Sequence, residues 1–269
     1  SVAVGTGALL TQNPATATDM YNVAVGDDTG KLITTGGHNV LIGGLTGDAI
    51  TSGNSNVAIG YQALSADTLG DRNVAMGLQA LLTQNFTTST DSYNTAVGYA
   101  AGTLITTGIN NTLIGGLVGD ALIDADDNIA MGRGALSSDT YGSKSTALGR
   151  NALTTQNFTT ATESNNTAVG HNAGLSITTG QQNTLIGSLA GDALTDADYN
   201  VAVGYDSDTS ATSSTNQIVM GRGVTGNANL SFCFGEAAND SAIAFGATSI
   251  TAPSDVRLKE DIQDEKVGL

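Results

Sequence analysis

The sequence predicts an all-β fold of the parallel β-solenoid, or β-roll, class. A five-residue signature that ends in glycine recurs thirteen times along the chain. Its glycines follow one another at 17-residue or 21-residue intervals, which are too short for the helix pairs of helical solenoids. The apolar residues alternate or form short runs, whereas a helix would repeat them every three to four positions.

The signature reads NVAVG in its purest form, and its copies follow a regular order. One 21-residue interval is followed by three 17-residue intervals, and this series runs three times. It defines a 72-residue super-repeat, which the similar segments at 10–22, 82–94 and 154–166 also obey. The thirteen glycines are Gly5, Gly26, Gly43, Gly60, Gly77, Gly98, Gly115, Gly132, Gly149, Gly170, Gly187, Gly204 and Gly221.

Each coil is expected to form one short strand from its pentad, to turn at the glycine and to return through a second strand such as AL, DALI or TLIT. Coils stacked about 4.8 Å apart would make a rod on the order of 60 Å long. Asparagine opens ten of the thirteen pentads, from Asn22 to Asn200. Stacked Asn side chains form hydrogen-bonded ladders, but Asn also tolerates turn conformations, and the sequence favours neither explanation.

Both faces of the pentad strand are apolar. Alternation puts the second and fourth pentad residues on one face and the third on the other. The fourth is Val, Ile, Met or Leu in every copy, and the second is Val, Ile or Thr. The third is Ala except at Leu41, Leu113, Leu185 and Val219. Because a thin roll covers only its inner face, we expect an elongated homotrimer with Leu41, Leu113 and Leu185 packed at its axis. The alternative is a monomer whose surface tolerates the small Ala side chains.

Composition limits the partners and the chemistry. The net charge of -16, with only nine Lys and Arg residues, opposes binding to nucleic acid or anionic lipid. The sequence contains no run of 18 apolar residues, so it does not predict insertion into a membrane. The single cysteine, Cys233, excludes an intrachain disulfide. His38 and His171 are isolated, and no Ser-His-Asp or paired-Glu pattern indicates an enzyme, so we expect no cofactor.

The pentads over residues 1–221 resemble the head repeats of trimeric autotransporter adhesins. In that family, similar Ser/Asn-Val-Ala-Ile-Gly strands build a left-handed, trimeric β-roll. The 17-residue and 21-residue periods are longer than is typical there, although Gly235 follows Gly221 after a shorter, 14-residue step. The resemblance implies a trimeric roll with longer loops.

A second resemblance lies near the end of the chain. The segment PSDVRLKEDI at 253–262 is similar to the start of the intramolecular chaperone of phage tail fibres, tailspikes and endosialidases. There, a Ser-Asp-x-Arg-Leu-Lys stretch joins a trimeric fibre to a self-cleaving chaperone. The resemblance implies that Ser254 is the nucleophile at the Ser254–Asp255 bond and that Lys259 activates it. Read without the resemblance, the segment caps and begins a charged helix.

These observations divide the chain into three parts. Residues 1–221 are the trimeric β-roll shaft, and 222–253 are a closing or transition segment that contains SFCFG and SAIAFG. Residues 254–269 are the start of a truncated chaperone domain. Because so little of that domain follows the junction, we do not expect this chain to cleave itself.

Two sets of side chains are candidate sites. The 21-residue coils have four additional residues each, which should protrude every fourth coil, and binding residues are often on such loops. The candidate receptor contacts there, which could instead pack on a neighbouring subunit, are Tyr21, Phe86, Tyr93 and Phe158. Weak candidates for calcium are Asp124, Asp126, Asp196 and Asp198. No EF-hand loop is present, so we favour solvation of the loops as their role and expect no metal.

The expected function is structural: the shaft of a trimeric phage tail fibre, extracellular and part of the virion. Its expected partners are other copies, other tail or appendage proteins, and a host surface glycan or receptor. The alternative is the head of a trimeric bacterial surface adhesin, or an extracellular filament. A carbohydrate-degrading tailspike is disfavoured because aromatic residues are scarce. An ice-binding solenoid is disfavoured because the ITTG segments, at 33–36, 105–108 and 177–180, recur only once in each 72-residue super-repeat.

Overall fold

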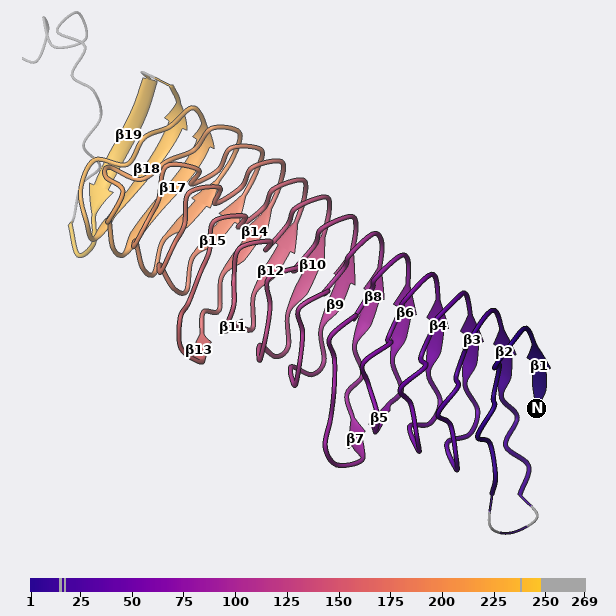
Figure 1. The fold of residues 1–269 in the computed structure, drawn as a ribbon. Coiled ribbons are helices and arrows are strands. Elements are labelled where there is room, and N and C mark those ends of the chain that lie inside the picture. Colours follow the sequence, from indigo (N-terminus) through magenta and orange to yellow (C-terminus); the bar gives the residue numbers. More distant parts are fainter. Residues whose placement is uncertain (15, 17, 238, 248–269) are drawn as a thin grey trace, which may run out of the picture.

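The computed structural model describes residues 1–14, 16, 18–237 and 239–247. These residues form an elongated rod of stacked coils, and one sheet of 15 strands follows the whole length of the rod (Figure 1). All its neighbouring strands are parallel except the last pair. The prediction of an all-β parallel solenoid is therefore confirmed. No helix in the described part of the chain has the length and apolar character that a membrane span needs.

The main sheet consists of the predicted pentad strands and two strands beyond them. Each of the first twelve begins at the second residue of its pentad, and the thirteenth begins at the first. The fifteen strands are β1 (Val2–Val4), β2 (Val23–Val25), β3 (Val40–Ile42), β4 (Val57–Ile59), β6 (Val74–Met76), β8 (Thr95–Val97), β9 (Thr112–Ile114), β10 (Ile129–Met131), β12 (Thr146–Leu148), β14 (Thr167–Val169), β15 (Thr184–Ile186), β16 (Val201–Val203), β17 (Gln217–Arg222), β18 (Ser231–Glu236) and β19 (Asn239–Ala244).

The strands pair in strict register, so that each pentad position lies beside the same position of the next coil. Ala24 pairs with Leu41, and Leu41 pairs with Ala58. The glycine that ends each pentad allows neighbouring coils to approach closely in this register. At Gly98, φ is +142°, and a Cβ would overlap the backbone carbonyl of Gly115 in the next coil. Only glycine fits such a position.

The sequence predicted a second strand in each coil, and this prediction is wrong for most of the chain. The returning segments are turns, in which Leu64 and Leu81 have φ values of 54° and 51°. A residue in the left-handed region interrupts the extended conformation of a strand. In the described part of the chain, the additional strands lie only at the base of protruding loops. There, β5 (Gly70–Asp71) pairs with β7 (Thr90–Asp91), and β11 (Gly142–Ser143) pairs with β13 (Thr162–Glu163).

The buried asparagines form a ladder along the rod. The Oδ1 atom of Asn39 accepts a hydrogen bond from the backbone N–H of Asn56 at 2.9 Å, and its Nδ2 atom donates to the carbonyl of Gly53 at 2.9 Å. The left-handed residue is the one before each asparagine, such as His38 with φ of 63°. Tolerance of a left-handed turn is therefore not the reason for asparagine, and the ladder is confirmed.

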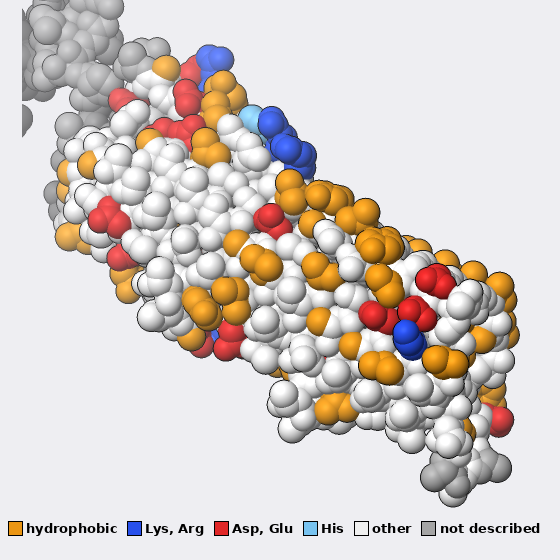
Figure 2. Space-filling view, viewed as in Figure 1, with side chains coloured by type: hydrophobic (Ala, Val, Ile, Leu, Met, Phe, Trp, Pro, Cys, Tyr) orange, Lys and Arg blue, Asp and Glu red, His pale blue; other side chains and the backbone are white. Residues whose placement is uncertain are grey.

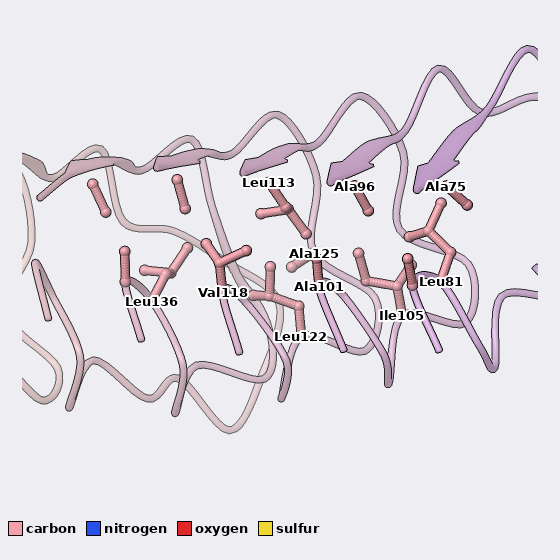
Figure 3. Packing of buried hydrophobic residues seen from close by; sticks show 14 of the residues in the cluster. Ala75, Leu81, Ala96, Ala101, Ile105, Leu113, Val118, Leu122, Ala125 and Leu136 are labelled. Atoms are coloured by element: carbon pink, nitrogen blue, oxygen red, sulfur yellow. The ribbon is translucent and has the colours of Figure 1, made fainter. Parts of the chain in front are cut away.

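The third pentad residues point into the rod and form its core. Figure 3 shows Ala75, Ala96 and Leu113 extending from the strands toward residues of the returning segments. Leu41, Leu113 and Leu185 are fully buried within one chain. Their assignment to a trimer axis is therefore wrong, because the strand alternation was read with the inner and outer faces exchanged.

Side-chain volume in this core follows the 72-residue super-repeat. Where the third pentad residue is Leu, the residue six positions later is Gly, as in Leu41 and Gly47. In several other coils a small Ala instead precedes a buried Leu six positions later, as in Ala58 and Leu64. A Cβ on Gly47 would come within 3.1 Å of Leu41 Cδ2 and 2.9 Å of Ile50 Cδ1. Large and small residues thus alternate so that the core stays close-packed.

The stack continues past Gly221 and then reverses. β18 pairs with β17 in parallel, while β19 pairs with β18 in the antiparallel direction. A second small core of Val219, Val224 and Cys233 lies beneath these strands. The parallel roll therefore extends into the segment at 222–253. The predicted chaperone start, 254–269, lies outside the described residues.

Candidate functional site

The outer face of the main sheet is an exposed apolar surface. Its side chains are the second and fourth pentad residues, which alternation turns away from the core. In β10, Ile129 is 46% exposed and Met131 is 47% exposed, whereas Ala130 between them is fully buried. Ile42, Ile186 and Met220 are exposed in the same way in other strands. We call this surface the outer sheet face.

Further apolar residues extend the outer sheet face at one side. Tyr61, Leu78 and Tyr99 each follow a pentad glycine in consecutive coils, and all three are exposed. In Figure 2 hydrophobic side chains form a row along the upper edge of the rod, over the half that contains its N-terminal coils. Soluble monomers rarely leave a continuous apolar surface uncovered, so this surface has the character of an interface.

Of the four candidate aromatic residues in the protruding loops, two are buried and two are exposed. Phe86 and Phe158 are only 5% exposed, so they are buried within their own chain and offer no platform to a receptor. The N–H of Phe158 donates to Asp139 Oδ1 at 3.0 Å, which anchors the loop to the shaft. Their assignment as receptor contacts is therefore wrong, because side chains that are buried within one chain present no surface to a receptor.

Tyr21 and Tyr93 remain accessible. Both are more than half exposed. Tyr21 stacks at a tilt on His38, with ring centroids 5.4 Å apart, and the guanidinium of Arg72 lies 5.7 Å from the ring centre of Tyr93. Each ring therefore lies beside a residue of a neighbouring coil and exposes its remaining surface, which is suited to contact with another molecule.

The carboxylates of the candidate calcium ligands accept hydrogen bonds from the protein's own backbone and side chains. Asp126 Oδ1 accepts the N–H of Ile109 at 2.8 Å, and Asp198 Oδ1 accepts the N–H of Gln181 at 2.7 Å. Asp124 accepts the hydroxyl of Thr107, and Asp196 that of Thr195. Within the described residues, no group of three or more His, Cys, Asp or Glu side chains is placed to hold a metal ion. Three of these four carboxylates, all but Asp196, connect neighbouring coils.

Several carboxylates are partly enclosed between coils. Burial raises the pKa of Asp208 to about 6, and the nearby charge of Asp192 adds to this effect. Burial likewise raises the pKa of Asp67, although Gln84 Nε2 donates a hydrogen bond to its Oδ2 at 2.6 Å. Asp67 also accepts the N–H of Gly70, at the base of a protruding loop. The Asp67 carboxylate therefore organises a turn.

Threonines stack more regularly than the sequence analysis recognised. Thr34, Thr51 and Thr68 occupy the same place in consecutive coils, eight positions after the pentad glycine. Thr34 Oγ1 donates to the carbonyl of Thr51 at 3.1 Å, and Thr51 Oγ1 donates to that of Thr68 at 3.2 Å. The statement that threonine segments recur only once in each super-repeat is wrong for this position. Asn85, Ile123 and Asn157 interrupt the row, and the hydroxyl protons point along the rod.

A polar groove lies beside the loop that contains β13. It has a volume of about 430 Å³ and is lined by Asp126, Asp127, Ser143, Lys144, Ala161, Thr162 and Glu163. Lys144 Nζ and Glu163 Oε1 form an ion pair at 2.5 Å. Three carboxylates face one ammonium group, so the groove carries an excess of negative charge. We call it the acidic groove.

The acidic groove was not predicted as a site, and only Asp126 among its lining residues was singled out, as a weak candidate for calcium. The signal that could have found it is the set of charged residues directly before two consecutive pentads, with Asp126 and Asp127 before Asn128 and Lys144 before Ser145. Ser254 and Lys259, the candidate residues for self-cleavage, lie outside the described residues.

Comparison with known proteins gives no assignment. No family model, no curated protein and no solved structure matches this chain.

Proposed function

We propose that this chain is the shaft segment of a trimeric extracellular fibre, in which three copies cover one another's outer sheet faces. The observation that carries the proposal is the two-sided apolar character of the pentad strands. One side fills the core of the rod, and the other is exposed in a single chain. Strands that are apolar on both faces are normally covered on both faces.

A cyclic arrangement of parallel copies suits this surface best. The outer sheet face is continuous along the rod and repeats every coil, so copies aligned side by side bury it along its whole length. Three copies around a rotation axis cover all three faces. An open row of copies would instead leave an uncovered face at each end. The exposed aromatic rings of the protruding loops, Tyr21 and Tyr93, then lie on the outside, where they suit contact with a glycan or receptor.

Within this class, we favour a phage tail fibre over a bacterial adhesin head. The reason is the resemblance of 253–262 to the junction of tail-fibre chaperones, which accompanies the fibre-like repeat. The fibre would then belong to the virion and connect to other tail proteins.

The first experiment is a measurement of solution mass by light scattering. A particle near three times 26.9 kDa is expected for the purified chain. A stable monomer across the accessible concentration range would overturn the proposal, since the outer sheet face would then need no partner.

A second experiment separates the two candidate sources of the fibre. A chain extended through a complete chaperone domain is expected to cleave at the Ser254–Asp255 bond, and the Ser254→Ala variant is expected to remain whole. An extended wild-type chain that also remains whole would remove the argument for a tail fibre and leave the adhesin head.

A further inference from the structure

The two edges of the outer sheet face differ in charge over the same three coils. The leading edge consists of the residue two positions before each strand, and the trailing edge of the residue two positions after it. Over β10, β12 and β14, the leading edge is Asp127, Lys144 and Asn165, and the trailing edge is Arg133, Arg150 and His171.

The trailing edge concentrates positive charge. β10 pairs with β12 and β12 with β14 in register, so Arg133, Arg150 and His171 stand in one row about 4.8 Å apart. All three are exposed, and neither guanidinium forms an ion pair with a residue that the structure describes. Figure 2 shows blue and pale-blue side chains together on the edge where the apolar row ends. The two stacked guanidinium groups of Arg133 and Arg150 repel each other, so this row favours an anionic partner.

The leading edge at the same height borders the acidic groove, whose lining shares Asp127 and Lys144 with this edge and adds Asp126 and Glu163. Glu163 is neutralised by Lys144, which leaves Asp126 and Asp127 as the excess charge. Asp127 is exposed, and its Oδ1 atom accepts one hydrogen bond, from Asn110 Nδ2 at 3.1 Å. The rest of its carboxylate faces the groove and is free to accept further donors.

These two charged regions cannot neutralise each other within one chain. Asp127 and Arg133 lie at opposite ends of β10, and six residues of extended chain span roughly 20 Å. In a ring of copies related by rotation, however, the leading edge of one copy meets the trailing edge of the next at the same height. Every interface of such a ring then brings an acidic groove to a basic row.

We propose that the acidic groove of one copy receives Arg133 or Arg150 from the neighbouring copy, and that this contact determines the axial register of the fibre. The inference rests on the proposed trimer. Because the apolar strands repeat in every coil, they allow several axial offsets between copies. The charged rows occupy only three coils, so few offsets bring opposite charges together.

Disulfide trapping tests the contact. Chains with Asp127→Cys plus Arg133→Cys, or Asp127→Cys plus Arg150→Cys, are oxidised and separated on a non-reducing gel. One of the two pairs is expected to give covalent trimers. The matched control, Asp127→Cys plus Arg222→Cys, has its second cysteine on the same trailing edge but five coils away, and is expected to remain uncrosslinked. The wild-type chain, with buried Cys233, is the blank.

Charge exchange provides an independent measurement. Arg133→Asp and Asp127→Arg are each expected to weaken the trimer at least about tenfold in dissociation constant, and the double variant to restore it. Lys31→Glu changes the net charge equally but lies away from both edges, and is expected to have little effect.

The outcomes separate this inference from the proposed function. A wild-type trimer that neither cross-links through the edge pairs nor responds to charge exchange overturns the register contact and leaves the trimer standing. Cross-linking of the control pair as strongly as the edge pairs also overturns it. A wild-type monomer overturns the proposed function itself.

Discussion

Leu41 fills the space that Gly30 leaves open in the preceding coil, where a Cβ on Gly30 would lie 2.9 Å from Leu41 Cδ1. This contact between neighbouring coils repeats with the super-repeat at Leu113 and Leu185. The core therefore follows the same 72-residue period as the protruding loops.

The first prediction concerns this packing. Leu41→Ala is expected to destabilise the fold by about 2–5 kcal/mol, because it leaves a cavity that neighbouring coils cannot fill. Gly30→Ala is also expected to destabilise it, since the added Cβ meets Leu41 and the backbone has a φ of +56°. The double variant should cost less than the sum of the two, because removal of the Leu41 side chain makes room for the new Cβ. Thermal and urea unfolding measure all three.

Gly116→Ala is the matched control for these variants. A Cβ at Gly116 would meet no atom within 4 Å. The free energy of unfolding of Gly116→Ala is therefore expected to stay close to that of the wild type. Equal destabilisation by Gly30→Ala and Gly116→Ala would contradict the packing explanation.

The second prediction concerns the asparagine ladder. Asn56→Ala removes the acceptor of the Asn73 N–H and the donor to the Gly70 carbonyl, both of them buried. Two unsatisfied buried groups are expected to cost about 2–4 kcal/mol in unfolding free energy. Ser55→Ala, next to it but exposed, should change stability little. Chemical denaturation of the two variants decides the matter, and equal stabilities would show that the ladder contributes nothing.

The third prediction concerns the outer sheet face. Ile129→Lys places a charge in the proposed interface, so it is expected to convert trimers to monomers while the coil fold remains. Leu32→Lys is the matched control, because Leu32 is 45% exposed, nearly the same as Ile129, but lies away from the sheet. Light scattering gives the mass, and circular dichroism reports the fold. Dissociation by the control alone would place the interface elsewhere.

The fourth prediction concerns pH. The pKa of Asp208 is raised to about 6 by burial, above the value of about 3.9 expected in the unfolded chain. The unfolded state therefore releases its proton first, and this residue's contribution to stability falls as pH rises from about 4 to 6. Asp208→Asn is expected to raise the unfolding temperature at pH 7. The unfolding temperature of this variant is also expected to depend less on pH between about 4 and 6. A variant that is less stable than wild type at pH 7 would contradict this.

The sequence alone predicted much of the architecture, because the strand residues and their glycines repeat at fixed intervals. Gly98 has no alternative at its φ of +142°, and the asparagines before the strands allowed a ladder, which the structure confirms. The direction of the strand faces was read wrongly. The Val, Ile, Met and Leu residues at the fourth position are as apolar as the core, so their hydropathy did not distinguish the outer face from the inner one.

What the sequence determined by itself is the period, the strands and their register, since these depend on local chain geometry and on identical coils stacking. Only the tertiary structure decided which apolar face is buried, that Phe86 and Phe158 are buried within their own chain, and that Arg133 and Asp127 lie at opposite edges of one surface. These outcomes depend on how far the returning segment of each coil reaches over the strand. That distance is set by the left-handed turns and by side-chain volume in neighbouring coils, which no single repeat contains.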